Sequence, residues 1–389
     1  MELSRDWSGE RRSGNGNANG ATSGVGRIQA LLGELHRSCS RPWTLMEVCG
    51  GQTHAILRHG LDQLLPPQLT LIHGPGCPVC VTDSGRIEQA LTLAGRPEVI
   101  LCSFGDMLRV PGSSGRDLLE QRGAGGDVRV VYSPLDVLAI ARSNPERRVV
   151  FFAVGFETTA PATALLAERA LAEGLANLEL LVAHVRVPPV LEVMLADPEC
   201  RVQAILAAGH VCTVMGEEEY GAIASRHRRP IVVTGFEPEE LLRGMLAAVR
   251  QLERGEHRVE NAYARAARAQ GNAGARALLE RVFLPVDREW RGLGTIPAGG
   301  LELKPPYDTL ASRVEITADD AGPVLSSANG REGPTHAPAP ACISGLVLQG
   351  LKKPQACPSF GTTCTPERPL GAPMVSGEGA CAAYYRYQR

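Results

Sequence analysis

Short apolar runs that end in glycine- or proline-rich turns recur along this chain and alternate with helical segments. Eight such runs lie between residues 43 and 234, namely WTLMEV, LTLIH, EVILCSF, VRVVY, RRVVFFAV, LELLVAHV, VQAILAAG and RPIVVT. Amphipathic stretches such as RIEQALTLAG and ATALLAERALAEGL separate them. Apolar strands that alternate with helices predict βαβ units, and hence an α/β fold with parallel sheets whose strands end at a common ligand-binding edge.

Eight strands exceed one sheet of ordinary size, and 389 residues exceed one ordinary core. We therefore expect two doubly wound parallel-sheet domains that meet near residue 145. The expected divisions are a disordered tail over residues 1–26, a first α/β domain over 27–145, a second over 146–255 and a third region over 256–389. The third region should begin with a helix over 260–283 and continue as irregular, partly helical chain that carries an iron–sulfur site, with a flexible loop over 316–341.

Composition narrows the classes of protein to which this chain can belong. The net charge of −2 gives no reason to expect nucleic acid as a partner, and no apolar run is long enough to predict a membrane span. The first 26 residues lack the apolar stretch of a secretory signal, so a cytoplasmic location is expected. In that compartment eleven cysteines are expected to be metal ligands or reactive thiols rather than structural disulfides.

The segment MEVCGGQTHAI places a cysteine where the first run turns into a helix. Backbone N–H groups and the helix dipole at such a turn favour an anion, so we expect Cys49 to be ionised near neutral pH. Gly50 and Gly51 let another group approach the backbone closely, and His54 could orient a ligand or carry a proton. The alternative is that Cys49 is a small buried residue and that His54 caps the turn.

A second cysteine motif, GPGCPVC, follows the next apolar run. Its Cys77 and Cys80 form a C-x-x-C, which in an intracellular βαβ setting is typical of a redox pair or of half a metal site. Neighbouring strands lie about 4.8 Å apart. If the two runs are neighbours, Cys49, Cys77 and Cys80 come within reach of one iron or zinc ion. A lone C-x-x-C is weak evidence, but the two turns together favour a three-thiolate site.

The last four cysteines form a third group with the spacing C-x14-C-x6-C-x16-C, at Cys342, Cys357, Cys364 and Cys381. Structural zinc sites mostly use paired C-x2–4-C knuckles, and this group has none. Widely spaced thiolates in a glycine- and proline-rich segment favour a [4Fe–4S] cluster, with zinc as the alternative. Either metal would also help to hold the segment together.

Three further polar residues follow predicted strands. Glu157 in GFETTAP and Glu237 in GFEPEE could line the cleft between domains, but we favour slightly the interpretation that each is a helix N-terminal acid. His210 in AAGHVC is another cleft candidate, although a histidine at a strand end is often only hydrogen-bonded. The remaining cysteines are interpreted as ordinary thiols: Cys39, Cys102, Cys200 and Cys212.

Six motifs of this chain resemble those of the hydrogenase maturation (formation) protein HypD family. They are MEVCGGQTHAI, GPGCPVCV, FGDMLRVPGS, VVFFAVGFETTAP, GFEP and MVSGEGACAAYY, and the likeness runs from Ile28 to Tyr387. The resemblance implies two α/β domains plus a cluster-bearing region. It also implies a scaffold with redox activity, rather than a turnover enzyme, for assembly of the Fe(CN)2CO group of [NiFe] hydrogenase.

The resemblance also implies partners, cofactors and ligands. The partners are a HypC-like small chaperone and a HypE-like cyanide donor, and the iron that carries cyanide and CO is bound transiently. By motif match, the family's iron-binding and essential cysteines correspond to Cys49, Cys77 and Cys80, and its [4Fe–4S] ligands to Cys342, Cys357, Cys364 and Cys381.

The chain departs from the family pattern at three positions. Gln52 stands where many relatives have histidine, which leaves its role open. Ser344 and Pro373 stand where the family often has cysteine, but neither belongs to the four-cysteine spacing.

Two other classes of function remain alternatives. A cluster-dependent thiol–disulfide reductase would cycle Cys77 and Cys80 between dithiol and disulfide and would not need Cys49, whereas the scaffold does need it. A binding module would use its metals only structurally. The sequence contains no Walker-type G-x4-G-K-[ST] motif.

Overall fold

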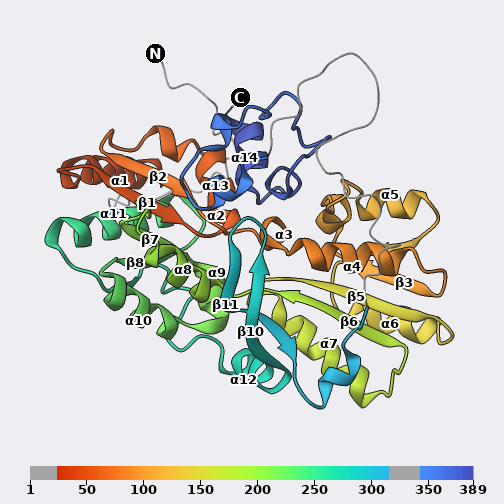
Figure 1. Ribbon diagram of the computed structural model, residues 1–389. Coiled ribbons are helices and arrows are strands. Elements are labelled where there is room, and N and C mark those ends of the chain that lie inside the picture. Colours follow the sequence, from red (N-terminus) through yellow and green to blue (C-terminus); the bar gives the residue numbers. More distant parts are fainter. Residues whose placement is uncertain (1–23, 315–341, 389) are drawn as a thin grey trace, which may run out of the picture.

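Two parallel β-sheets form the framework of the computed structural model, which describes residues 24–314 and 342–388 (Figure 1). All eight predicted strands are present. Helix α1 begins at Gly24, within the predicted tail. The rest of that tail and the loop predicted over 316–341 lie outside the described residues.

The first sheet has five parallel strands in the order β2-β1-β7-β8-β9. Their bounds are β1 (Trp43–Glu47), β2 (Leu69–His73), β7 (Ala204–Ala208), β8 (Ile231–Thr234) and β9 (Val259–Asn261). Glu47, the last residue of β1, pairs with His73, the last residue of β2. The turns that carry Cys49 and Cys77 therefore leave the same edge of the sheet side by side, as the sequence predicted.

The second sheet has four parallel strands in the order β4-β3-β5-β6. Their bounds are β3 (Val99–Ser103), β4 (Asp127–Val130), β5 (Arg148–Gly155) and β6 (Leu178–His184). The two central strands, β3 and β5, are buried almost throughout, which explains why their sequences are continuous apolar runs.

Residue 145, where we expected one domain to end and the next to begin, lies in the turn before β5, within the part of the chain that builds this second sheet. Strand β3 before it pairs with β5 after it, while β1 pairs with the distant β7. The chain builds the first two strands of one sheet, crosses to build the whole of the other, and then returns. The rhythm of apolar runs reveals where strands are but not which strands pair, so the sequence alone did not show this crossing.

Helices cover both faces of each sheet, as a doubly wound fold requires. Leu45 and its neighbour Met46 point into different cores, and so do Phe151 and Phe152. On the first sheet, one face packs against α1 (Gly24–Ser38), α2 (Gly50–Arg58) and α11 (Pro238–Arg254), and the other against α8 (Val187–Ala196), α9 (Gly209–Met215) and α10 (Glu218–His227). On the second sheet the faces pack against α6 (Asp136–Ser143), α7 (Ala160–Ala172) and α12 (Ala273–Val282), and against α4 (Ser84–Ala94) and α5 (Leu118–Gly123).

The chain after residue 256 differs from the predicted helix followed by irregular structure. Residues 259–261 add β9 to the first sheet, and within the helix predicted over 260–283 only Ala273–Val282 are helical, as α12. An antiparallel hairpin of β10 (Phe283–Trp290) and β11 (Gly294–Leu303) follows. The hairpin packs against β6 and α8 (Figure 1). It was missed because glycine and proline interrupt its apolar pattern.

Residues 342–388 form an irregular segment with two short helices, α13 (Ser344–Leu348) and α14 (Ala380–Tyr387), as expected for this region. Ala383 and Tyr384 of this segment pack against Leu57 of α2, above the edge where β1 and β2 end (Figure 1). No helix in the described part of the chain is long and apolar enough to cross a membrane.

Candidate functional site

The turns that follow β1 and β2 are in direct backbone contact. The Gly50 nitrogen donates a hydrogen bond of 2.8 Å to the Gly76 carbonyl oxygen. A Cβ atom added to Gly76 would overlap the backbone nitrogen of Cys49. A Cβ atom added to Gly50 would overlap Glu378, so the C-terminal segment closes over the same turn. These glycines allow three chain segments to meet around Cys49.

A buried carboxylate, Glu47, fixes the geometry of this junction. Its Oε2 accepts a 2.8 Å hydrogen bond from the Cys49 nitrogen, and its Oε1 accepts hydrogen bonds from His73 Nδ1 at 2.6 Å and from the Thr53 hydroxyl. The His73 ring also lies edge-on to Tyr384 of α14. We did not predict Glu47 or His73, although an acid at the end of an apolar strand and a histidine at the end of its neighbour were available signals.

The sulfur of Cys49 lies 3.5 Å from Nδ1 of His210, the cleft candidate at the start of α9. Burial raises the pKa of the Cys49 thiol, and the nearby Glu47 carboxylate adds to the increase. This corrects the expectation that the helix end keeps Cys49 ionised, because burial outweighs the backbone N–H groups. Burial lowers the pKa of His210 to about 4, so its imidazole is neutral near pH 7.

His54 contacts a different partner. Its Nε2 lies 3.2 Å from the hydroxyl of Tyr387, and the two rings meet edge to face. This contact ties α2 to α14. His54 also lines an open cavity with Gly51, but the histidine that contacts the Cys49 sulfur is His210.

Gln52 is fully buried and connects the ends of two strands. Its side-chain nitrogen donates to the carbonyl oxygens of Thr234, at 3.0 Å, and Ala207, at 3.3 Å. These hydrogen bonds join α2 to the ends of β7 and β8, so Gln52 has a structural role at the edge of the first sheet.

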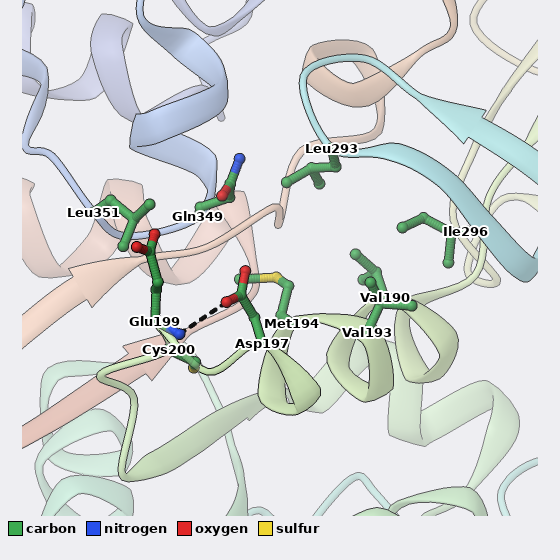
Figure 2. Close-up of a pocket in the computed structure, with 10 residues that line it drawn as sticks. All are labelled: Val190, Val193, Met194, Asp197, Glu199, Cys200, Leu293, Ile296, Gln349 and Leu351. Atoms are coloured by element: carbon green, nitrogen blue, oxygen red, sulfur yellow. Dashed lines mark hydrogen bonds between the residues drawn. The ribbon is translucent and has the colours of Figure 1, made fainter.

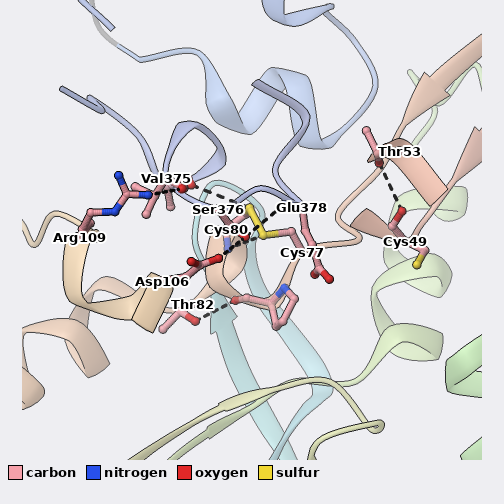
Figure 3. The surroundings of a disulfide bond; sticks show 12 residues. Cys49, Thr53, Cys77, Cys80, Thr82, Asp106, Arg109, Val375, Ser376 and Glu378 are labelled. Carbon is pink, nitrogen blue, oxygen red and sulfur yellow. Dashed lines mark hydrogen bonds between the residues drawn. A yellow bond between two sulfur atoms is a disulfide. The ribbon is translucent and has the colours of Figure 1, made fainter. Parts of the chain in front are cut away.

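Cys77 and Cys80 form a disulfide, and both are almost fully buried, with exposed fractions of 3% and 1%. Cys77 caps α3 (Pro78–Val81), and its sulfur accepts a hydrogen bond from the Cys80 nitrogen. Figure 3 shows the disulfide beside the Val375–Glu378 segment and apart from Cys49. In this oxidised state the two sulfurs are not thiolates. Across residues 24–314 and 342–388, no three His, Cys, Asp or Glu side chains converge to hold one metal ion.

The four C-terminal cysteines line one small pocket together with Ile343, Val347, Phe360 and Met374. Burial and the neighbouring sulfurs of Cys342, Cys364 and Cys357 raise the pKa of Cys381. A Cβ atom added to Gly371 would lie only 2.6 Å from the Cys342 sulfur. Four soft donors gathered in an apolar pocket, with a glycine that leaves room beside one of them, fit an iron–sulfur cluster. Ser344 and Pro373, two of the three departures from the family pattern, line the same pocket.

The two acids predicted as cleft or helix residues differ in role. Glu237 forms a capping box with Glu240 at the start of α11, so the helix interpretation is confirmed for it. Glu157 is buried, and its Oε1 accepts a hydrogen bond from the Val187 nitrogen at the start of α8. Its Oε2 has no hydrogen-bond partner among the described residues, and burial raises the pKa of Glu157 to about 7.

Two further cavities differ in character. A pocket between α8 and the β10–β11 turn is lined mainly by apolar side chains, with Cys200 as its one sulfhydryl (Figure 2). An open cavity of about 1080 Å³ lies where β3, β4 and β5 end, and Gly51, His54, Pro78 and Glu378 lie on its wall. This second cavity connects solvent with both cysteine turns.

Comparison with known proteins gives one consistent match. The family model HypD, described as "Hydrogenase formation hypA family", matches residues 26–388. "Hydrogenase maturation factor HypD" of Rhizobium leguminosarum bv. viciae is 47% identical over 357 residues, which cover 90% of this chain and 89% of that protein. The proteins of the same name from Rhodobacter capsulatus and Escherichia coli (strain K12) are 44% and 45% identical, with 93% and 94% of this chain covered and 94% of each relative. This chain belongs to the HypD family.

Proposed function

We propose that this chain is a scaffold on which the Fe(CN)2CO group of [NiFe] hydrogenase is assembled, with Cys49 as the iron-binding thiol. Family membership and the names of the relatives support a role in hydrogenase maturation. The observation that carries the specific proposal is the contact between the sulfur of the buried Cys49 and Nδ1 of the partly buried His210.

Cys49 and His210 offer an iron ion a soft sulfur donor and an imidazole nitrogen. Because the Cys49 thiol is protonated in the free protein, iron binding releases its proton. The neutral His210 needs no deprotonation to act as a ligand. Glu47 holds the Cys49 backbone in place, and the glycines around it let the neighbouring chain segments pack directly against this turn.

The disulfide of Cys77 and Cys80 supplies a second function close by. Two electrons and two protons convert it to a pair of thiols, which would then be available as ligands or reductants. A four-iron cluster on Cys342, Cys357, Cys364 and Cys381 would supply single electrons, and a low-potential one-electron donor would have to recharge it. The C-terminal segment lies next to the disulfide, because its Ser376 hydroxyl donates a hydrogen bond to Asp106 beside the disulfide (Figure 3).

The open cavity, rather than the buried thiols, offers a surface on which a partner protein could dock. A cavity of about 1080 Å³ exceeds what two cyanides and one CO require, and it leads from solvent to Gly51 and Pro78. This size supports docking of a polypeptide segment from a HypC-like chaperone or a HypE-like cyanide donor.

Infrared spectroscopy tests the scaffold proposal. The protein purified without oxygen together with its small partner should show cyanide and CO stretching bands. The Cys49→Ser variant should lose these bands and keep its fold, because a hydroxyl is a hard and weakly acidic donor. The half-buried Cys200 lies outside the motifs, so Cys200→Ser is the matched control and should keep the bands. Full-intensity bands in Cys49→Ser would reject Cys49 as the iron ligand.

The observed disulfide favours one second candidate, a cluster-dependent thiol–disulfide reductase. In that case Cys77 and Cys80 would be needed and Cys49 would not. Counting alkylated thiols by mass spectrometry, over a series of redox buffers, shows whether the pair cycles. Two results together would favour the reductase. The Cys77–Cys80 pair would cycle normally between disulfide and dithiol in Cys49→Ser, and the wild-type protein would show no cyanide bands.

A further inference from the structure

Arg291 lies at the turn of the β10–β11 hairpin and anchors that turn beside the disulfide. Its backbone nitrogen donates a 2.9 Å hydrogen bond to the carbonyl oxygen of Val81, the residue after Cys80. Its Nη2 donates a 2.9 Å hydrogen bond to the Pro111 carbonyl oxygen. The turn is therefore attached directly to the helix that carries Cys80.

The same turn also contacts the segment that begins at Cys342. Gln349 donates from its side-chain nitrogen to the Gly292 carbonyl oxygen at 3.3 Å. A Cβ atom added to Gly345 would lie 2.8 Å from that same oxygen, so the two backbones touch. Figure 2 shows Leu293 of the turn and Gln349 of the C-terminal segment on the wall of one pocket. The hairpin turn that carries Arg291 thus contacts both the disulfide helix and the segment that follows Cys342.

One nitrogen of the Arg291 guanidinium, Nη1, is buried and makes no hydrogen bond within the described residues. Burial lowers the pKa of Arg291, and nearby acidic groups counter this effect, in decreasing order Cys342, Glu88 and Asp83. The two carboxylates accept hydrogen bonds from backbone nitrogens instead, Glu88 from Ser113 and Asp83 from Gly85. A buried donor without an acceptor is costly, so such a group is most readily explained by an acceptor that binds there.

We propose that Arg291 is an electrostatic positioning residue for the four-cysteine centre, and that its free Nη1–H donates to a sulfur of that centre on the Cys342 side. The inference rests on the proposed function, because it requires a cluster at these cysteines. Arg291 keeps its proton throughout, and no bond forms or breaks in the protein. Its fixed positive charge favours the more negative, reduced state of the centre and so raises its reduction potential.

Redox titration of the anaerobically reconstituted protein, followed by electron paramagnetic resonance, tests this role. Arg291→Gln should disfavour cluster reduction about tenfold, which corresponds to about 59 mV for one electron. Arg291→Lys keeps the positive charge, so its cluster should have a reduction potential closer to that of the wild type. Arg243→Gln removes an exposed arginine from α11 and should leave the potential unchanged.

An unchanged potential in Arg291→Gln would overturn the inference. If Arg291→Gln assembles no cluster, Arg291→Lys is used instead. A cluster with nearly wild-type potential in Arg291→Lys supports the role of the positive charge. Loss of the cluster in Arg291→Lys as well overturns the inference. A wild-type protein that takes up no iron and sulfide would instead reject the cluster part of the proposed function.

Discussion

The Cys49 sulfur and His210 Nδ1 lie 3.5 Å apart although 161 positions separate the two residues in the sequence. They meet because β1 pairs with β7, so the turns after these two strands leave the sheet at adjacent points. A buried thiol and a partly buried imidazole from distant parts of the chain thus form one pair.

His210→Ala should weaken iron retention by about 10- to 100-fold, because it removes the side chain that contacts the Cys49 sulfur. The measurement is the iron that remains on the anaerobically purified complex during competition with a chelator. His54→Ala is the comparison variant, since His54 contacts Tyr387 rather than the sulfur. Greater iron loss in His54→Ala than in His210→Ala would reverse the roles assigned here.

The anaerobically purified protein should be brown, with iron and sulfide in the ratio of a four-iron cluster, and Cys357→Ala should lose both. The same variant should unfold more easily in its C-terminal segment, because ligand binding there also contributes folding free energy. Cys200→Ala, which lies outside the four-cysteine pocket, should keep the cluster. Stoichiometric zinc without iron or sulfide would show that the zinc alternative is correct.

Gly76→Ala should lower the free energy of unfolding by about 1–3 kcal/mol or more, because the new methyl group would overlap the Cys49 backbone. It should also disturb every function of Cys49. Gly221→Ala in α10 is the matched control, since no atom lies within 4 Å of the added Cβ, and it should stabilise the protein by about 0.5–1 kcal/mol. Denaturant unfolding measures both effects, and equal stability of the two variants would contradict the close contact.

Glu157→Gln should become more stable relative to the wild type as the pH rises. The folded-state pKa of about 7 lies above the ordinary value of 4.5, so the stability contribution of the protonated acid is present at low pH and is lost as the pH rises through 7. Between pH 5.5 and pH 8 the difference in unfolding free energy should grow by about 2 kcal/mol. Urea unfolding at both pH values gives the result. A difference for Glu157→Gln that does not vary with pH would show that Glu157 is not held protonated.

Local sequence patterns were enough to predict the strands, their turns and the cysteine groups of this protein. Apolar runs that end in glycine and proline are local features, so all eight strands between residues 43 and 234 could be predicted, and the C-x14-C-x6-C-x16-C spacing identified the cysteines that share a pocket. The hairpin after residue 283 escaped prediction because its local pattern is weak.

Which strands pair and which side chains meet became known only from the folded structure. Pairing of β1 with β7 depends on contacts between distant segments, so only the fold could select His210 rather than His54 as the neighbour of Cys49. The ionisation of Cys49 was decided in the same way. A helix end favours a thiolate, but burial beside Glu47 opposes it more strongly, and burial is a property of the packed protein rather than of the local sequence.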